Sequence, residues 1–230
     1  MKVVQNLVPS SKYSIKCPYP MVAEFIVVHN TANDASARNE IAYMISNNNQ
    51  VSFHYAVDDK EIVQGIPENR NAWHAGDGAN GQGNRKGLSI EICYSKSGGK
   101  RFEEAEKLAA KFIAYKLKEK GWGINRVKKH QDFSGKYCPH RTLDMGWQRF
   151  LDMVQTELDK LKGGVSVTQD KNQPSPWTKE AWEWAKKEGI VDGTNPQGAA
   201  TREQVVTMLY RYHKQVLTML NRYHKQVAQK

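Results

Sequence analysis

The chain has 230 residues, of which 39% are hydrophobic and 25% are charged. This length suffices for one large domain or two smaller ones with a buried core, and the composition excludes a disordered chain. The formal net charge of +10 comes from 34 basic and 24 acidic residues spread along the sequence, without an arginine-rich arm. This charge fits an anionic partner, either nucleic acid or an anionic cell-wall polymer, and charge alone does not choose between the two.

The sequence carries no apolar run as long as a membrane span, and residues 1–14 lack the apolar middle of a signal peptide. We therefore expect synthesis in the cytoplasm and no membrane insertion, so that action on a cell wall requires release by another factor. The cysteines are Cys17, Cys93 and Cys138, an odd number that argues against a disulfide framework. We expect Cys17 and Cys93 to be buried, reduced thiols.

Hydrophobic patterning predicts an α/β domain over residues 1–162. Apolar or alternating runs predict strands at 25–28, 51–57, 61–64 and 88–94, with a polar hairpin turn at 58–60. Helical periodicity predicts helices at about 35–46, 102–120 and 143–161, and Gly121 ends the second of them. Strands interleaved with helices indicate a central sheet flanked by helices.

The composition changes at Gly163. Residues 163–176 carry Gly, Ser and Pro without apolar periodicity, which predicts a linker. Residues 177–230 then predict a small all-α domain, with a first helix that Gly189 ends and a second helix with Thr201 as its N-cap.

A direct repeat lies at the C-terminal end of the sequence. TMLYRYHKQV at 207–216 recurs as TMLNRYHKQV at 218–227. The offset of eleven residues is three helical turns at about 3.67 residues per turn, so both copies present the same face. That face carries an apolar stripe formed by Val205, Leu209, Tyr212, Val216, Leu220, Tyr223 and Val227. The repeat is either a harmless extension of a terminal helix or a self-association face over residues 205–227.

Three residues with metal-ligand chemistry stand where an α/β domain can bring them together. His29 ends the apolar run at 25–28, and His130 and Cys138 bracket the polar stretch HQDFSGKYCPH. Two imidazoles and a thiolate suit Zn²⁺, and three protein ligands leave a fourth position open for water. An open zinc position favours hydrolysis. His140 competes with Cys138 as a ligand on residue type alone.

The segments that carry these residues resemble a known family. VVHNTA, SFHYAVDD, AWHAGDG, LSIEICYS and HQDFSGKYCPH occur in the order found in type 2 N-acetylmuramoyl-L-alanine amidases, most closely in endolysins of phages and prophages. The resemblance covers residues 1–160 and implies the mixed sheet of that family. It also implies a zinc-dependent hydrolase that cleaves the amide bond between N-acetylmuramic acid and L-alanine in peptidoglycan. Further along, WEWA at 182–185, GIVDG at 189–193 and TREQ at 201–204 make residues 177–230 resemble one S-layer homology repeat, which implies binding to secondary cell-wall polymer.

The resemblance assigns roles to individual residues. It implies His29, His130 and Cys138 as zinc ligands, with Cys138 preferred over His140. Glu91 corresponds to the catalytic glutamate, and Lys136 to the lysine that stabilises negative charge in the tetrahedral intermediate. On residue type alone, Glu91 is also compatible with an exposed strand carboxylate and Lys136 with a solvated loop lysine.

Three further residues are expected to bind substrate. His74 resembles a histidine that lines the family's groove, and Trp73 and Asn84 accompany it. Trp73 is equally compatible with a role in core packing. Phe53 stands where some relatives carry a catalytic tyrosine, which leaves proton transfer to Glu91. His54 is expected to support the site rather than to bind the metal.

Two other functions compete with the amidase. The first is a catalytically inactive peptidoglycan-binding protein on the same fold, which typically lacks the cysteine ligand. The second is a basic, zinc-stabilised nucleic-acid binder, which would need four closing ligands and clustered basic residues; the sequence has neither. We therefore expect peptidoglycan as the partner, with no nucleic acid.

Overall fold

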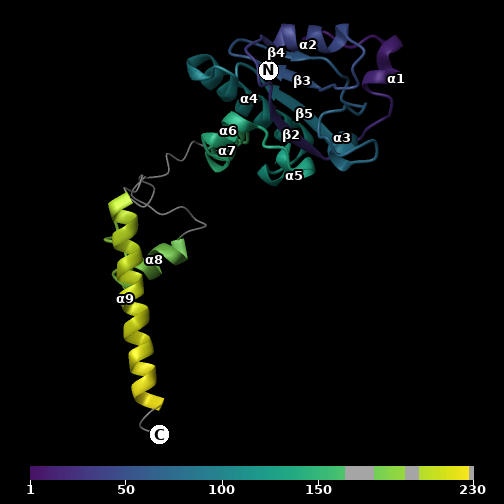
Figure 1. The fold of residues 1–230 in the computed structure, drawn as a ribbon. Helices are drawn as coiled ribbons and strands as arrows, with labels where there is room; N and C mark the ends of the chain where they lie inside the picture. The colour runs from purple at the N-terminus through teal and green to yellow at the C-terminus, as the bar shows by residue number, and fades with distance from the viewer. Residues whose placement is uncertain (164–178, 195–201, 228–230) are drawn as a thin grey trace. The chain divides into compact units, whose positions relative to one another are not determined.

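The computed structural model describes residues 1–163, 179–194 and 202–227 (Figure 1). Contacts divide the chain into two compact units, Met1–Val165 and Ser166–Lys230, and each is described by itself. Nearly all of the predicted linker at 163–176 and the predicted N-cap Thr201 lie outside the described residues.

The first unit is built on a six-stranded sheet. Its strands in spatial order are β1 (Val4–Gln5), β4 (Ile62–Gln64), β3 (Tyr55–Val57), β5 (Gly87–Ile92), β2 (Phe25–Asn30) and β6 (Val127–Lys129). All neighbouring pairs are parallel except β3 and β4, which form the predicted antiparallel hairpin. The mixed central sheet flanked by helices is therefore confirmed.

The two faces of the sheet have different tasks. On one face, Tyr55 packs against Phe112 of the long helix α4 (Gly99–Lys120), with ring centroids 4.8 Å apart. Helix α7 (Trp147–Leu161) packs on α4 in turn and completes the apolar core on this side. On the other face, His29 of β2 pairs in register with Glu91 of β5, and Ala56 of β3 pairs with Glu91 from the other side. Residues in register on parallel strands point to the same face of the sheet. His29 and Glu91 therefore both project from the face opposite to α4.

Shorter helices surround the sheet. They are η1 (Ser10–Lys12), α1 (Tyr13–Lys16), α2 (Ala37–Ser46), α3 (Gln82–Lys86), η2 (Ile124–Arg126), α5 (Gln131–Ser134) and α6 (His140–Asp144). Two side chains fix the start of α2, which packs on β3 and β4. Ser36 accepts a hydrogen bond from the backbone N–H of Asn39 at 3.3 Å, and Asp58 accepts one from that of Ala37 at 2.9 Å.

Two predicted elements differ from the structure. The strand predicted at 51–57 begins only at Tyr55, because the N–H of Ser52 donates to the carbonyl of Trp73 and that of His54 to the Ser89 hydroxyl. The helix predicted at 143–161 is divided into α6 and α7 at Gly146, which has a φ of +106° that interrupts the helix. The short strands β1 and β6 were not predicted, since two or three residues carry no periodic signal.

Other expectations for the first unit hold. Cys17 and Cys93 are free and fully buried, as predicted. Gly121 ends α4 in a left-handed conformation, with a φ of +67°. Among the described residues, no helix combines the length and apolar character that crossing a membrane requires.

The described part of the second unit contains helices α8 (Lys179–Lys187) and α9 (Arg202–Val227). Gly189 follows α8 with a φ of +65°, as the predicted helix end requires. Trp184 of α8 meets Tyr212 of α9 edge to face, with ring centroids 6.4 Å apart. Both copies of the repeat lie in the one continuous helix α9, whose described side chains are mostly exposed.

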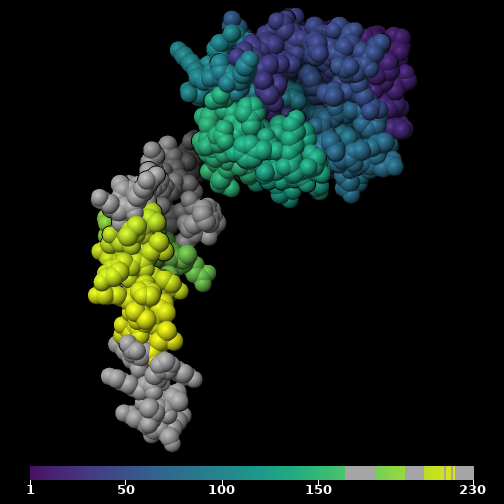
Figure 2. All heavy atoms as spheres, in the orientation of Figure 1, coloured from purple at the N-terminus to yellow at the C-terminus, as the bar shows by residue number. Residues whose placement is uncertain are grey.

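A buried lysine fixes the loop after α2. The Lys16 side chain is fully buried, and its ammonium donates to Asn47 Oδ1 at 3.0 Å, to the Val51 carbonyl at 3.1 Å and to the Asn49 carbonyl. The purple N-terminal residues accordingly lie against the blue segment that includes this loop (Figure 2). Lys16 therefore holds one wall of the cavity described below, to which Asn47, Asn49 and Val51 contribute.

We predict that Lys16→Met lowers the free energy of unfolding by about 1–3 kcal/mol, because it leaves partly buried acceptors without their donor. Urea denaturation of both proteins measures the difference. Lys100→Met, at an exposed position, is the control and should change stability little. Equal stability of the two variants would show that the hydrogen bonds of the Lys16 ammonium contribute nothing to the free energy of unfolding.

Candidate metal and active site

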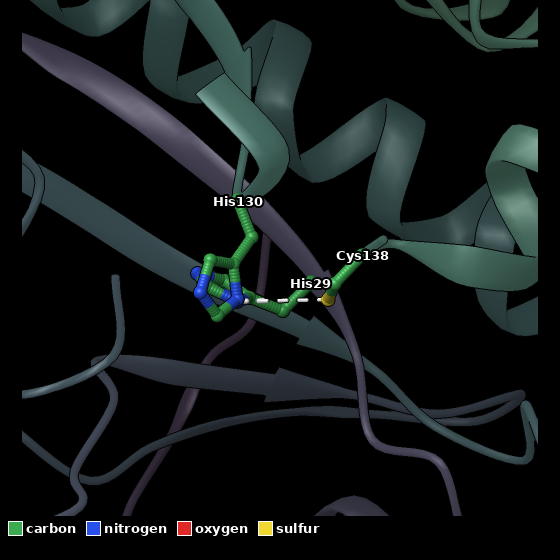
Figure 3. A group of neighbouring side chains, drawn as sticks. All are labelled: His29, His130 and Cys138. Atoms are coloured by element: carbon green, nitrogen blue, oxygen red, sulfur yellow. Dashed lines mark hydrogen bonds between the residues drawn. The ribbon is translucent and has the colours of Figure 1, made fainter. Parts of the chain in front are cut away.

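The metal-ligand residues come from two adjacent strands and one loop. His29 lies in β2, and His130 directly follows β6, where its N–H donates to the Val28 carbonyl of β2 at 3.3 Å. Cys138 lies in the loop between α5 and α6, which the N–H of Gln131 closes by donating to the Cys138 carbonyl at 3.0 Å. The three side chains therefore point toward one another although 109 residues separate the outer two (Figure 3).

The distances suit a zinc site. His29 Nδ1 lies 3.0 Å from His130 Nδ1 and 3.9 Å from Cys138 Sγ, and the three ligand atoms all lie within 4.8 Å of one another. Tetrahedral zinc with ordinary bond lengths separates two nitrogens by about 3.3 Å and a nitrogen from a sulfur by about 3.6 Å. All three residues are buried, so the set forms a compact pocket of soft and borderline donors.

The protonation states also fit a metal. Burial lowers the pKa of His29 and of His130, which keeps both imidazoles neutral and able to ligate. Burial, followed by the charge of Glu91, raises the pKa of the Cys138 thiol to about 11. A thiolate in this place therefore requires a strong local positive charge, which Zn²⁺ supplies.

A second histidine fixes the orientation of the first. His29 Nε2 lies 2.9 Å from His74 Nδ1, so with Nδ1 on a metal the Nε2–H donates to His74. Asn84 holds His74 in turn, because its Oδ1 accepts from the backbone N–H groups of His74 and Ala75, both at 2.8 Å. Its amide nitrogen donates to the Gly78 carbonyl at 3.1 Å. The polar atoms of Asn84 are thus engaged in shaping the loop around His74.

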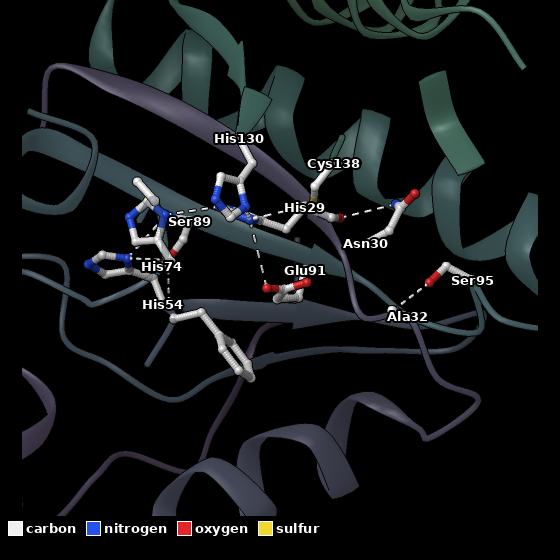
Figure 4. Close-up of polar contacts among 12 residues, drawn as sticks. His29, Asn30, Ala32, His54, His74, Ser89, Glu91, Ser95, His130 and Cys138 are labelled. Carbon is white, nitrogen blue, oxygen red and sulfur yellow. Dashed lines mark hydrogen bonds and ion pairs between the residues drawn. The ribbon is translucent and has the colours of Figure 1, made fainter. Parts of the chain in front are cut away.

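Glu91 stands beside the ligands on the same face of the sheet. Its Oε1 lies 4.0 Å from His29 Nδ1 (Figure 4). The Glu91 side chain is 15% exposed. Oε2 is buried and has no hydrogen-bond partner among the described residues. Burial, and next the charge of Glu40, raises the pKa of Glu91 to about 8. The carboxylate thus points into the site rather than to bulk solvent, and a bound cation would favour its ionised form.

The other predicted site residues line the same cavity, which has a volume of about 810 Å³. Lys136 is exposed at its edge. After burial, its charge adds to the lowering of the pKa of His29 and of His130, and it offsets part of the rise in the pKa of Glu91 and of Cys138. Trp73 is half-buried, with its ring edge-on to Tyr19 and its Nε1–H donating to the Ile15 carbonyl at 3.0 Å. Trp73 therefore combines a packing role with a place in the cavity wall. Phe53 is also part of this wall.

The two remaining histidines of this unit stand apart from the ligand atoms. His54 is fully buried, with Nδ1 2.9 Å from the Ser89 hydroxyl and Nε2 2.9 Å from the Arg70 carbonyl. His140 Nε2 lies 3.3 Å from the Ser95 carbonyl. Among the described residues, the group that could hold a metal ion contains Cys138 and not His140.

Sequence reasoning missed several residues of the cavity. Thr31 and Glu40 line it with buried polar atoms that lack partners, and Tyr43 and Val51 line it with side chains 66% and 64% exposed. A signal for Glu40 was present in the sequence. It shares helical spacing with the buried residues Ala37, Ile41 and Met44, so a carboxylate there must face the sheet.

Comparison with known proteins agrees with this geometry. The model of the Amidase_2 family, N-acetylmuramoyl-L-alanine amidase, matches residues 19–141. The chain is 64% identical over 164 residues to N-acetylmuramoyl-L-alanine amidase CwlA of Bacillus subtilis (strain 168), covering 71% of this chain and 60% of CwlA. It is 62% identical over 167 residues to N-acetylmuramoyl-L-alanine amidase XlyB of the same organism, covering 72% of this chain and 51% of XlyB. The chain thus spans between half and two thirds of these relatives.

Solved structures show the same likeness in three dimensions. The structure of PlyL is 52% identical, with a TM-score of 0.66, and the match covers 68% of this chain and 99% of PlyL. The solution structure of the PlyG catalytic domain is 51% identical, also with a TM-score of 0.66, and covers 73% of this chain and 98% of that domain. With a family match over more than half of its residues, this chain belongs to the N-acetylmuramoyl-L-alanine amidase family.

Proposed function

We propose that this chain is a zinc-dependent hydrolase of bacterial peptidoglycan that cleaves the amide bond between N-acetylmuramic acid and L-alanine. The observation that carries the proposal is the convergence of His29, His130 and Cys138 in one cavity, with the Glu91 carboxylate 4.0 Å from His29. Membership of the amidase family supports the same reaction. Mass spectrometry of digested peptidoglycan tests it, since the reaction frees alanine amino groups and creates no new reducing sugars.

The residues divide the work of the reaction. His29, His130 and Cys138 would hold zinc, which would polarise the amide carbonyl and lower the pKa of a water molecule. Glu91 accepts a proton from the attacking water and delivers it to the alanine nitrogen as the C–N bond breaks. Lys136 supplies positive charge at the cavity edge and stabilises the negative charge that develops on the carbonyl oxygen. His74 keeps the His29 ring in its ligating orientation.

The alternative is a catalytically inactive peptidoglycan-binding protein on the same fold. Such a protein needs a cavity for the glycopeptide but neither a complete ligand set nor a buried base. This chain has all three ligands, Glu91 and Lys136 around one cavity, which favours catalysis.

We further propose that the second unit binds secondary cell-wall polymer and that the protein acts as an endolysin on Gram-positive walls after its release from the cytoplasm. Support for wall binding is the resemblance of residues 177–230 to an S-layer homology repeat. Residues 205–227 are also a candidate self-association face. Leu209 and Leu220, eleven residues apart, are 61% and 48% exposed. Exposed apolar side chains are expected on a face that packs against a second helix.

We predict that Cys138→Ser lowers zinc content well below one ion per chain and abolishes lysis, because a hydroxyl is a much poorer zinc ligand than a thiolate. The melting temperature should fall as well, since the metal binds the folded state. Elemental analysis after dialysis measures the zinc. Cys93→Ala, which removes a buried thiol that lies outside the ligand set, is the control and should retain zinc. Full zinc content and activity in Cys138→Ser would refute the ligand assignment.

Glu91→Gln should retain zinc and lose turnover by about 10²-fold or more, since it removes the base and leaves the ligands. Loss of zinc instead would make Glu91 a ligand or a structural support. Turnover of soluble muropeptides and zinc content are measured on the same preparation.

Because the pKa of Glu91 is raised, Glu91→Gln should also change how the stability of the zinc-free protein depends on pH. The pKa of the Glu91 carboxyl is about 8 in the folded protein, against an ordinary value of 4.5. This shift costs no stability at a pH below 4.5, and the cost grows as the pH rises from 4.5 toward 8. Chelated Glu91→Gln should therefore become more stable than the chelated parent across this interval. Thermal denaturation between pH 5 and pH 8 should show the difference growing with pH.

Truncation after Lys162 should leave cleavage of soluble muropeptides intact, because every site residue precedes that point. Binding to intact walls should weaken, since a tethered binding module raises the effective concentration of the enzyme at its substrate. A second variant lacking only residues 218–227 tests the helical stripe by sedimentation. A shift toward monomer supports self-association, whereas an unchanged profile identifies the repeat as an inert extension.

A further inference from the structure

Glu40 is a buried acid that the reaction described above does not use. It lies one turn into α2, is 8% exposed and lines the cavity that holds the ligands and Glu91. Its Oε1 is buried and has no hydrogen-bond partner in the described part of the chain, and no ion pair to Glu40 occurs there either. Burial raises the pKa of Glu40, and a hydrogen bond from Asn33 offsets part of this effect.

The two other buried acids of the first unit each have at least one strong partner, although Glu106 Oε1 is also buried without one. Asp58 accepts hydrogen bonds from the backbone N–H groups of Ala37, Lys60 and Glu61 at 2.9, 2.8 and 2.9 Å. Glu106 is 2.6 Å from the Arg149 guanidinium. An unpaired buried carboxylate costs stability, so Glu40 differs from acids that serve the fold. Such groups occur preferentially where a ligand completes the pairing.

The surroundings of Glu40 define what that ligand is. The Thr31 hydroxyl oxygen and Glu91 Oε2 are also buried without partners, and both residues line the same cavity. Helix α2, which carries Glu40, packs on β3, the strand that pairs with β5 at Glu91. Glu40 and Glu91 are close enough for mutual repulsion to raise the pKa of Glu91. Two carboxylates and a hydroxyl oxygen accept hydrogen bonds and favour a compact cation with several N–H donors.

The proposed reaction produces such a group beside Glu91. The oxygen of water adds to the carbonyl carbon and the C–N bond breaks. Both water protons end on the alanine nitrogen, which becomes an ammonium, and the lactyl group becomes a carboxylate. The ammonium carries three N–H donors and a positive charge, whereas the amide nitrogen of the substrate carries one N–H and no charge. An α-amino group has a pKa of about 8, so it is charged at neutral pH.

We propose that Glu40 binds the alanine nitrogen: its carboxylate accepts the amide N–H of the bound substrate and forms an ion pair with the ammonium after cleavage. Glu40 thereby orients the leaving group toward Glu91, which delivers the proton. The Asp58 carboxylate and the Ser36 cap hold the first turn of α2, and so fix the position from which Glu40 reaches into the cavity. This inference rests on the proposed amidase function and adds a site for the leaving group.

The test compares two peptides on the zinc-loaded full chain at pH 6.5, where the alanine amino group is protonated. One is a stem peptide with a free N-terminal L-alanine, and the other is the same peptide N-acetylated. Inhibition of muropeptide cleavage measures the affinity of each. The parent should prefer the free amine by about 10-fold, as a charge-assisted hydrogen bond allows. Glu40→Gln should lose most of this preference while retaining zinc, and Glu103→Gln, at an exposed position of α4, should keep it.

Stability separates this role from a structural one. Removing an unpaired buried charge should leave the melting temperature of Glu40→Gln unchanged or higher, with a lower kcat/KM on muropeptides. A lower melting temperature together with an equal loss of affinity for both peptides would identify Glu40 as a structural residue. Unchanged preference in Glu40→Gln, or no preference in the parent, overturns the proposal. If the parent protein frees no alanine amino groups from muropeptides, the amidase function itself is refuted. That outcome is seen in the cleavage products, whereas the role of Glu40 is measured by peptide inhibition.

Discussion

The site depends on the parallel pairing of β2 with both of its neighbours. Register places His29 of β2 opposite Glu91 of β5, and pairing with β6 on the other side brings His130 to the end of the same sheet edge. A slip of one residue would turn His29 to the face that α4 covers and would destroy the ligand set. The packed core between the sheet, α4 and α7 therefore holds the register on which the chemistry rests.

The cavity contains an unusual concentration of unsatisfied polar atoms. Thr31, Glu40, His74, Glu91 and His130 each present a buried atom without a partner in the described residues, and all five residues line it. A folded protein tolerates such groups at a cost of about 1–3 kcal/mol each, because a metal, water or substrate completes them in use. Elsewhere in the described residues, buried atoms without a partner occur on Asn71, Arg85 and Glu106, although Glu106 Oε2 forms an ion pair with Arg149.

Amidase membership follows from residues 19–141, whereas the second unit poses a separate physical question. Helix α9 is long, and the exposed apolar side chains along it include Val206, Leu209 and Leu217. A helix of this kind gains stability by burying that surface against another body. A second copy of the chain is the candidate occupant of this face, and the alternative is that the repeat is an inert extension of the helix, while wall polymer is the proposed ligand of the unit. Wall binding and self-association differ in the observable each changes, since the first alters wall affinity and the second alters sedimentation.

The sequence by itself determined the fold class, the hairpin at 58–60 and the thiol states of Cys17 and Cys93, because apolar periodicity and cysteine count are local properties of the chain. The resemblance to a known family identified His29, His130, Cys138 and Glu91 as candidate site residues. The tertiary structure showed that they lie together. Only the tertiary structure showed that the Asn84 amide is engaged by the His74 loop and that Glu40 shares a cavity with Glu91. Partners, burial and missing partners arise from contacts between segments far apart in sequence, which no local pattern records.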